Sequence, residues 1–318
     1  MELYSKCTRI TCLIIVYIYF LIGTVGNALI IWTIFRLKHL RSMHNVIVAS
    51  LAACDFLIIG YLLTMNMEVL ISNKEPNFHH CRFHAVVSTF LFICCLQLIM
   101  LIALSRFIKI CHSGKYNTVF TVQTLAIVVT VIFGIDTIFC SSMWFDDDMW
   151  IFDKPLQTCF YNRYKSSVAS AIGIAITMGL PFVVTLFCYF EIHRQVMKSR
   201  KQIHLHLNNG LNRRLFAHEN MVTRTQFAGF VMYMTLYMPM GITFYGKRSD
   251  FPEAFHTISL YLCFFNSCMN CILYGVLNKN MRKGYTESLP CIHWIHIQRN
   301  KIAPASPVTM SVINTTNV

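Results

Sequence analysis

The sequence predicts an all-α membrane protein: a seven-transmembrane helix bundle with a short amphipathic eighth helix. Of the 318 residues, 55% are hydrophobic and 13% are charged, with a mean hydropathy of +0.52. Soluble domains usually have about a quarter of their residues charged. A helix needs about 20 apolar residues to cross a bilayer, and seven segments are long enough: 10–35, 44–71, 82–110, 120–143, 168–196, 220–245 and 255–277.

The first segment, 10–35, is interpreted as a retained helix. Its apolar run exceeds the core of a signal peptide and contains Gly26-Asn27. The connections are short and no internal repeat is visible, which favours one compact bundle. The expected organisation is a short extracellular N-terminus (1–9), the bundle (10–277), a membrane-surface helix (278–290) and a cytoplasmic tail (291–318).

The positive charges predict how the bundle is oriented. With an external N-terminus, about two thirds of the 27 lysine and arginine residues fall in inner segments, as the positive-inside rule requires. This asymmetry, together with attraction to anionic membrane lipid, accounts for the net charge of +13. We therefore predict a multi-pass plasma-membrane protein that needs no nucleic-acid partner.

The fourteen cysteines do not indicate a disulfide scaffold, because most lie within apolar segments. Cys81 and Cys159 differ. One is at the outer start of the third segment and the other is in the external loop before the fifth, where a disulfide can persist. Such a bond would fix the loop over the mouth of the bundle. Cys7 and Cys12 could form another external bond.

A polar cluster is expected in the centre of the bundle. Asp55 lies in mid-helix, where a carboxylate is costly unless it is neutralised, paired or hydrogen-bonded. Its possible partners are Asn27 in the first segment and Asn266, Ser267 and Asn270 in the seventh. The cluster could bind a small hard cation such as sodium, or form a hydrogen-bonded network without an ion.

Arg106 closes an uncharged apolar run, 90–104, at the inner end of the third segment. An ionisable residue at membrane depth suggests a functional role. Glu219, at the inner start of the sixth segment, is the most obvious acidic partner, and a bridge between them would hold the inner face closed. The alternatives are an arginine that reaches the membrane surface and a solvated glutamate contributing about 0–1 kcal/mol.

Prolines interrupt two of the predicted helices. Pro181 lies in the fifth, two turns before Tyr189, and Pro239 lies in the sixth. A proline removes a backbone hydrogen bond and bends a helix. A bent sixth helix could move its inner half with little change at its outer half.

The residues after the seventh segment suit the membrane surface. The stretch 278–285 interleaves basic and apolar residues, as in helices that lie on a lipid surface. Cys291 beyond it could carry a palmitoyl chain or remain unmodified.

Together, these residues resemble the rhodopsin-like G-protein-coupled receptors. One set of matches occurs per helix, in family order, over about 10–285, with Phe133 in place of a tryptophan as the exception. The matches are Gly26-Asn27, Ser50-Leu51-Ala52 with Asp55, Cys81, Arg106, Cys159, Pro181 with Tyr189, Pro239, and Asn270 with Tyr274. The resemblance implies a receptor that activates a heterotrimeric G protein.

Within that family the sequence is most similar to melatonin receptors and their invertebrate relatives. The likeness lies in the seventh helix (265–278), the second inner loop (110–116) and Phe187-Cys188-Tyr189. Tyr237 replaces the tryptophan that precedes the sixth-helix proline. The resemblance assigns the activation switch to Arg106, Glu219, Tyr189, Tyr237, Pro239, Asn270 and Tyr274.

The positions expected to face an extracellular ligand differ from those of melatonin receptors. Met143 and Arg163 replace an asparagine and a glutamine that hold the ligand. Ser88 replaces the aspartate of amine receptors, and the seventh helix has no lysine for retinal. The ligand, a small molecule or a peptide, is expected to face His84, Ser88, Met143, Tyr161, Arg163 and Thr177.

Two other functions remain as alternatives. One is a seven-helix transporter or ion pathway that uses Asp55 and Asp136. The other is a receptor scaffold that does not signal, given Ser105, Phe133 and Tyr237. Enzymatic activity is not predicted, because the sequence has no nucleophile motif, phosphate loop or metal-ligand spacing. A possible sodium ion is the only expected cofactor.

Overall fold

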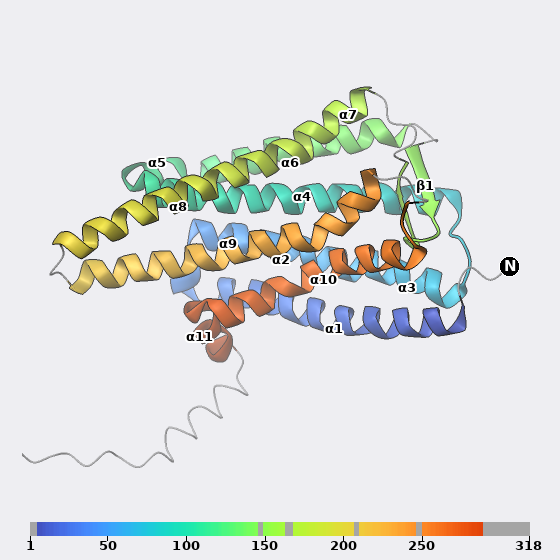
Figure 1. Cartoon of the computed structure of the whole chain (residues 1–318), viewed down its shortest axis with the longest axis horizontal. Coiled ribbons are helices and arrows are strands. Elements are labelled where there is room, and N and C mark those ends of the chain that lie inside the picture. The colour runs from blue at the N-terminus through green and yellow to red at the C-terminus, as the bar shows by residue number, and fades with distance from the viewer. Residues whose placement is uncertain (1–4, 146–148, 163–167, 207–209, 246–249, 289–318) are drawn as a thin grey trace, which may run out of the picture.

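The computed structural model describes residues 5–145, 149–162, 168–206, 210–245 and 250–288. These residues form one bundle of long helices with a two-stranded hairpin at one end (Figure 1). Each of the seven predicted segments contains one long helix of the bundle, so the predicted fold class is confirmed.

The helices follow the predicted segments closely. The first four are α1 (Lys6–Arg36), α2 (Met43–Leu57) continuing through η2 (Ile58–Leu62) into α3 (Leu63–Ser72), α4 (Phe78–Cys111) and α6 (Val122–Trp144). The others are α7 (Val168–Ile174) continuing through η6 (Ala175–Gly179) into α8 (Leu180–His206), α9 (Gly210–Tyr245) and α10 (Glu253–Leu277). Short turns η1 (Lys38–Leu40), η3 (Ser113–Lys115) and α5 (Tyr116–Val119) lie between them. Among the described helices, six are apolar enough to cross a membrane, and α9 completes the bundle.

Three helices begin four or more residues earlier than predicted, and α4 does so at Phe78, where the Asn77 side chain caps it. α1 begins at Lys6, within the expected N-terminal segment, because the Ser5 hydroxyl caps it by accepting the Thr8 amide at 3.2 Å. The Arg9 guanidinium then donates to the carbonyls of Leu70 (2.8 Å) and Ile71 (2.9 Å) at the end of α3. α9 begins at residue 210 rather than 220, because its first ten residues include Arg213, Arg214 and Glu219 and so fall outside the apolar run.

The buried centre of the bundle is α4. It contacts α2, α6, α8, α9 and both strands, and 67% of its most apolar window is buried. The corresponding value is 22% for α1 and 17% for α6. The outer helices therefore present apolar side chains outward, toward the lipid.

Two helices contain a π-helical segment that the sequence pattern did not predict. η2 follows Asp55 by three residues, and η6 ends just before Pro181. A proline ring collides with the carbonyl of the residue four positions earlier, here Thr177 within η6. The wider turn of the π segment accommodates Pro181, whereas Pro239 lies inside α9.

The hairpin pairs β1 (Trp150–Asp153) with β2 (Thr158–Tyr161) in antiparallel register, with Trp150 opposite Tyr161. A disulfide between Cys81 and Cys159 joins β2 to the start of α4, which confirms the predicted bond. Cys7 and Cys12 are both reduced thiols. The hairpin lies at the end of the bundle where α1 begins (Figure 1).

The predicted surface helix is present as α11 (Lys279–Ser288) and folds against the end of α1 (Figure 1). Gly284 makes this approach possible, because a Cβ there would lie 2.7 Å from Thr33 and 2.9 Å from Leu40. Burial raises the pKa of the Tyr285 phenol. Cys291 lies outside the described residues.

Candidate functional site

The hairpin tip, residues 154–157, lies in the outer mouth of the bundle. Gln157 adopts a left-handed backbone conformation with φ of 55° and is 1% exposed. Its carbonyl accepts the Asn66 amide at 3.0 Å, and its side-chain oxygen accepts the Tyr261 hydroxyl at 3.0 Å. The tip is thus hydrogen-bonded to α3 and α10 beneath the external surface.

The predicted ligand-facing residues divide into three groups. His84 is buried, and its Nε2 lies 2.9 Å from the Thr158 hydroxyl in the hairpin. Ser88 and Thr177 are buried and donate to carbonyls of their own helices. Tyr161 is placed by its backbone in β2. The side chains of Tyr161 and Met143, and the whole of Arg163, lie outside the described part. Their contact with a ligand remains a prediction.

The predicted polar cluster comes together in the centre of the bundle. Asn270 donates to the Asp55 carboxylate at 2.6 Å. Asn27 donates to the Ser267 carbonyl at 2.9 Å, joining α1 to α10. A Cβ on Gly26 would overlap the Cys271 side chain, so glycine allows this close approach.

The central residues have the chemistry of a site for a small hard cation. Asp55 is 1% exposed. The Ser267 hydroxyl interacts with its carboxylate, and the Asn27 side-chain oxygen has no hydrogen-bond partner among the described residues. Carboxylate, hydroxyl and carbonyl oxygens suit hard cations. Asn266 is buried nearby but makes none of these hydrogen bonds.

Sodium binding at Asp55 remains a prediction with a direct test. We expect the receptor to melt a few degrees higher in sodium chloride than in choline chloride at equal ionic strength, because a bound ion stabilises the folded state. Asp55→Asn should abolish this difference. A difference that persists in the variant would contradict Asp55 as the ligand. No difference in either protein would support the ion-free network.

The predicted switch residue Tyr237 lies against α4. Its ring meets Phe92 edge-on with centroids 5.8 Å apart and stacks on Tyr233 at 4.3 Å. The three rings lie just inward of the bend at Pro239. A movement of Phe92 would therefore act directly on α9.

Arg106 lies at the inner end of α4 and is 4% exposed. Its guanidinium acts electrostatically on His44, Tyr189 and Tyr274. The side chain is therefore enclosed by the bundle rather than extended to the membrane surface. The Glu219 side chain lies outside the described part, so its bridge to Arg106 remains a prediction.

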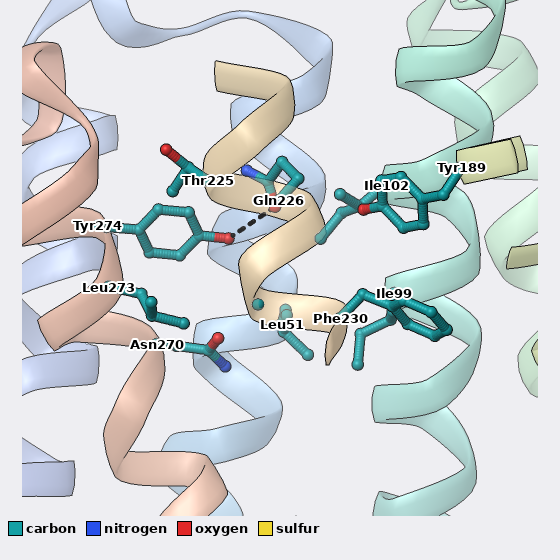
Figure 2. A pocket seen from close by; sticks show the side chains of 11 residues that line it. Leu51, Ile99, Ile102, Tyr189, Thr225, Gln226, Phe230, Asn270, Leu273 and Tyr274 are labelled. Carbon is teal, nitrogen blue, oxygen red and sulfur yellow. Dashed lines mark hydrogen bonds between the residues drawn. The ribbon is translucent and has the colours of Figure 1, made fainter. Parts of the chain in front are cut away.

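A hydrogen-bond chain crosses the inner half of the bundle, and Figure 2 shows the bond of this chain that joins Tyr274 to Gln226. The Tyr274 hydroxyl donates to the Gln226 oxygen at 3.3 Å, and the Gln226 amide nitrogen lies 3.3 Å from Nε2 of His44. An amide nitrogen only donates, so His44 accepts through Nε2. This inner chain, His44–Gln226–Tyr274, joins α2, α9 and α10.

The inner chain borders a small cavity of about 20 Å³. Figure 2 shows Gln226 and Tyr274 above Asn270 and Leu51, with Phe230 and Tyr189 toward α4. The volume is enough for about one water molecule. Tyr189 stacks on Phe230 with centroids 5.4 Å apart, so an aromatic pair joins α8 to α9 at the same level.

Asp136, which the sequence left unexplained, is buried between α6 and α4. Its carboxylate accepts the Gln97 amide at 2.7 Å. Asp55, the other carboxylate of the transporter alternative, faces α10 instead. Asp136 therefore lies where α6 packs on α4, and Asp55 lies where α2 packs on α10.

We expect Asp136→Asn to preserve the melting temperature of the purified receptor or raise it. The asparagine keeps an acceptor for Gln97 and removes the cost of burying a carboxylate. Asp136→Ala should destabilise the fold by about 1–3 kcal/mol, since it leaves the Gln97 amide unpaired. If the asparagine variant melts as low as the alanine variant, Asp136 has a role that requires its charge.

Several site residues were missed in the sequence. Gln226 and His44 stand in inner segments rich in basic residues, where polar side chains usually face solvent. The hydrogen bonds of Asn66, Gln157 and Tyr261 form only because the hairpin tip enters the bundle. One sign of a buried role was available in the sequence. Gln226 stands one turn inward of Phe230, on the apolar face of the sixth helix.

Known proteins support the same architecture. The profile of the 7 transmembrane receptor (rhodopsin family) matches residues 26–274. Melatonin receptor type 1A of Mus musculus is 28% identical over 84% of this chain and 76% of its own, and that of Gallus gallus is 27% identical over the same shares.

Among solved structures, squid rhodopsin superimposes with a TM-score of 0.75 over 95% of this chain and 93% of its own, at 14% identity, which shows the shared fold. The expected resemblance to melatonin receptors is confirmed. With a family profile that covers most of the chain and a bundle of the same form, this protein belongs to the rhodopsin family of seven-transmembrane receptors.

Proposed function

We propose that this receptor is activated by an extracellular ligand and promotes nucleotide exchange on a heterotrimeric G protein. The observation that carries the proposal is Arg106, which is 4% exposed at the inner end of α4 and within electrostatic range of His44, Tyr189 and Tyr274 on α2, α8 and α10. Such an arginine becomes available to a partner only when the inner helices separate. A ligand can drive this step only by binding the open state more tightly.

The N-terminus lies outside the cell in this proposal. The Cys81–Cys159 disulfide is at the hairpin end of the bundle, where α1 also begins. Disulfides persist in oxidising compartments. The basic α11 lies at the opposite end, facing the anionic inner leaflet.

The extracellular ligand has to act through or beneath the hairpin tip. Gln157 is held by Asn66 and Tyr261, and Thr158 by His84. Tyr261 connects the loop to α10, which carries the central and inner networks, and His84 connects it to α4, which carries Arg106. A screen of small molecules and peptides, including acidic indoles, against the purified receptor with G-protein nucleotide exchange as the readout tests the proposal. If neither the unmodified receptor nor variants with an opened inner face activate any G protein, the proposal is contradicted.

Melatonin is expected to bind this receptor poorly despite the family likeness. Met143 has only a weak acceptor and Arg163 only donates. Losing two neutral hydrogen bonds of about 0.5–1.5 kcal/mol each weakens binding about 5- to 150-fold. Radioligand saturation measures this, with the mouse type 1A receptor as positive control.

The matched variant for this test is Met143→Asn combined with Arg163→Gln. It restores both polar groups and should tighten melatonin binding by a similar factor. Saturable nanomolar binding to the unmodified chain would overturn the prediction.

A further inference from the structure

A groove of about 600 Å³ opens between α8 and α9 on the inner half of the bundle. Its apolar walls include Leu186, Phe190 and Met197 on α8 and Phe227 on α9. These four side chains are 45–60% exposed. Leu186, Phe190 and Met197 belong to an apolar span of the bundle. The groove therefore opens to the membrane rather than to the hairpin end of the bundle.

The groove has a polar side formed by His193, Thr223 and Arg224. Arg224 is one turn inward of Phe227 along α9, and His193 follows Phe190 along α8. The polar side therefore lies toward the inner membrane surface. The apolar wall continues outward to Leu186.

Arg224 is the positively charged side chain of the groove that an anionic ligand can reach. The nearest carboxylate on α8, Glu191, is engaged at 2.8 Å by Arg194, whose guanidinium also lies over the Phe190 ring. Arg224 is exposed and forms no ion pair with any side chain that the structure describes. A guanidinium of this kind binds phosphate oxygens through paired N–H groups.

We propose that this groove binds one anionic phospholipid of the inner leaflet, with its phosphate at Arg224 and an acyl chain along Phe190, Phe227 and Leu186. The inner leaflet supplies anionic lipid, and the volume falls in the range of sites for small ligands. A second copy of the receptor fits less well. A symmetric pairing would bring Arg224 toward its own equivalent. The site does not depend on G-protein coupling.

The test uses the full-length receptor in nanodiscs of phosphatidylcholine that contain a small fraction of photoreactive phosphatidylserine, with a diazirine on its acyl chain. After irradiation, mass spectrometry maps the adducts. We expect adducts on the α8 and α9 peptides that form the groove. Photoreactive phosphatidylcholine of the same chain should label them several-fold less.

Arg224→Gln should lower the phosphatidylserine yield in the groove about fivefold, the effect of removing one cation from an anionic lipid surface. Arg224→Lys should retain most of it. Lys279→Gln, which removes one exposed charge from α11, is the matched control and should leave labelling of the groove unchanged. Equal labelling by both lipids, no effect of Arg224→Gln, or receptor dimers cross-linked through the groove would each overturn the proposal.

Discussion

Gln226→Leu is expected to raise G-protein nucleotide exchange in the absence of any ligand. Leucine fills a similar volume but removes both hydrogen bonds of the inner chain, to Tyr274 and to His44. Each is worth about 0.5–1.5 kcal/mol, so the open-to-closed ratio should rise about 5- to 150-fold. GTPγS binding to purified heterotrimers, with the receptor in nanodiscs, measures this.

Two further variants test whether the inner chain is responsible. Tyr274→Phe removes one of the same hydrogen bonds and should raise basal exchange by a smaller factor. Thr225→Val is the matched control, because Thr225 lines the same cavity but donates to the Met221 carbonyl of its own helix. If Thr225→Val raises basal exchange as much as Gln226→Leu, the cavity rather than the hydrogen-bond chain controls the closed state.

Arg106→Ala should abolish nucleotide exchange while the receptor still reaches the cell surface. Arg106 is the buried cation that opening of the inner face would expose to the partner. Because the natural ligand is not needed when the inner chain is broken, the substitution is best made in the Gln226→Leu background. There it should return exchange to the level of membranes without receptor.

Arg106→Lys provides the comparison for this loss. Lysine keeps the charge but lacks the planar set of donors, so partial exchange is expected. Surface labelling and the Cys81–Cys159 disulfide serve as checks on folding. Unchanged exchange in the Gln226→Leu, Arg106→Ala double variant would remove Arg106 from the signalling mechanism.

Much of the fold was predictable because a helix that crosses a membrane has to be apolar and about 20 residues long. Apolar runs identified the seven helices, and the external positions of Cys81 and Cys159 predicted their bond. The start of α1 was missed because it depends on the Ser5 cap and on Arg9 reaching the end of α3.

The π segments were also missed. η6 depends on how α8 accommodates Pro181 in three dimensions. The spacing of apolar residues along the sequence does not reveal such a π-helical turn.

The site was predictable where the resemblance supplied it. Asp55, Asn270 and Arg106 occupy the places expected from the family motifs, and Asn270 does bind Asp55. The hairpin tip was not predictable, because Gln157 resembles an ordinary surface glutamine in sequence, and the inner chain was marked only by the place of Gln226 on the apolar face of the sixth helix. Only the path of the loop and the packing of α9 against α2 and α10 show that both are buried.

In the closed receptor, the inner chain holds α9 against the bundle. The most direct test is a spin-label distance between Lys115, in η3 just beyond the inner end of α4, and Arg224 on α9, both exposed. Labels attached through non-natural amino acids avoid the many cysteines. We expect Gln226→Leu to add a population at longer distance that is minor in the unmodified receptor and in Thr225→Val. Identical distance distributions in all three proteins would contradict it.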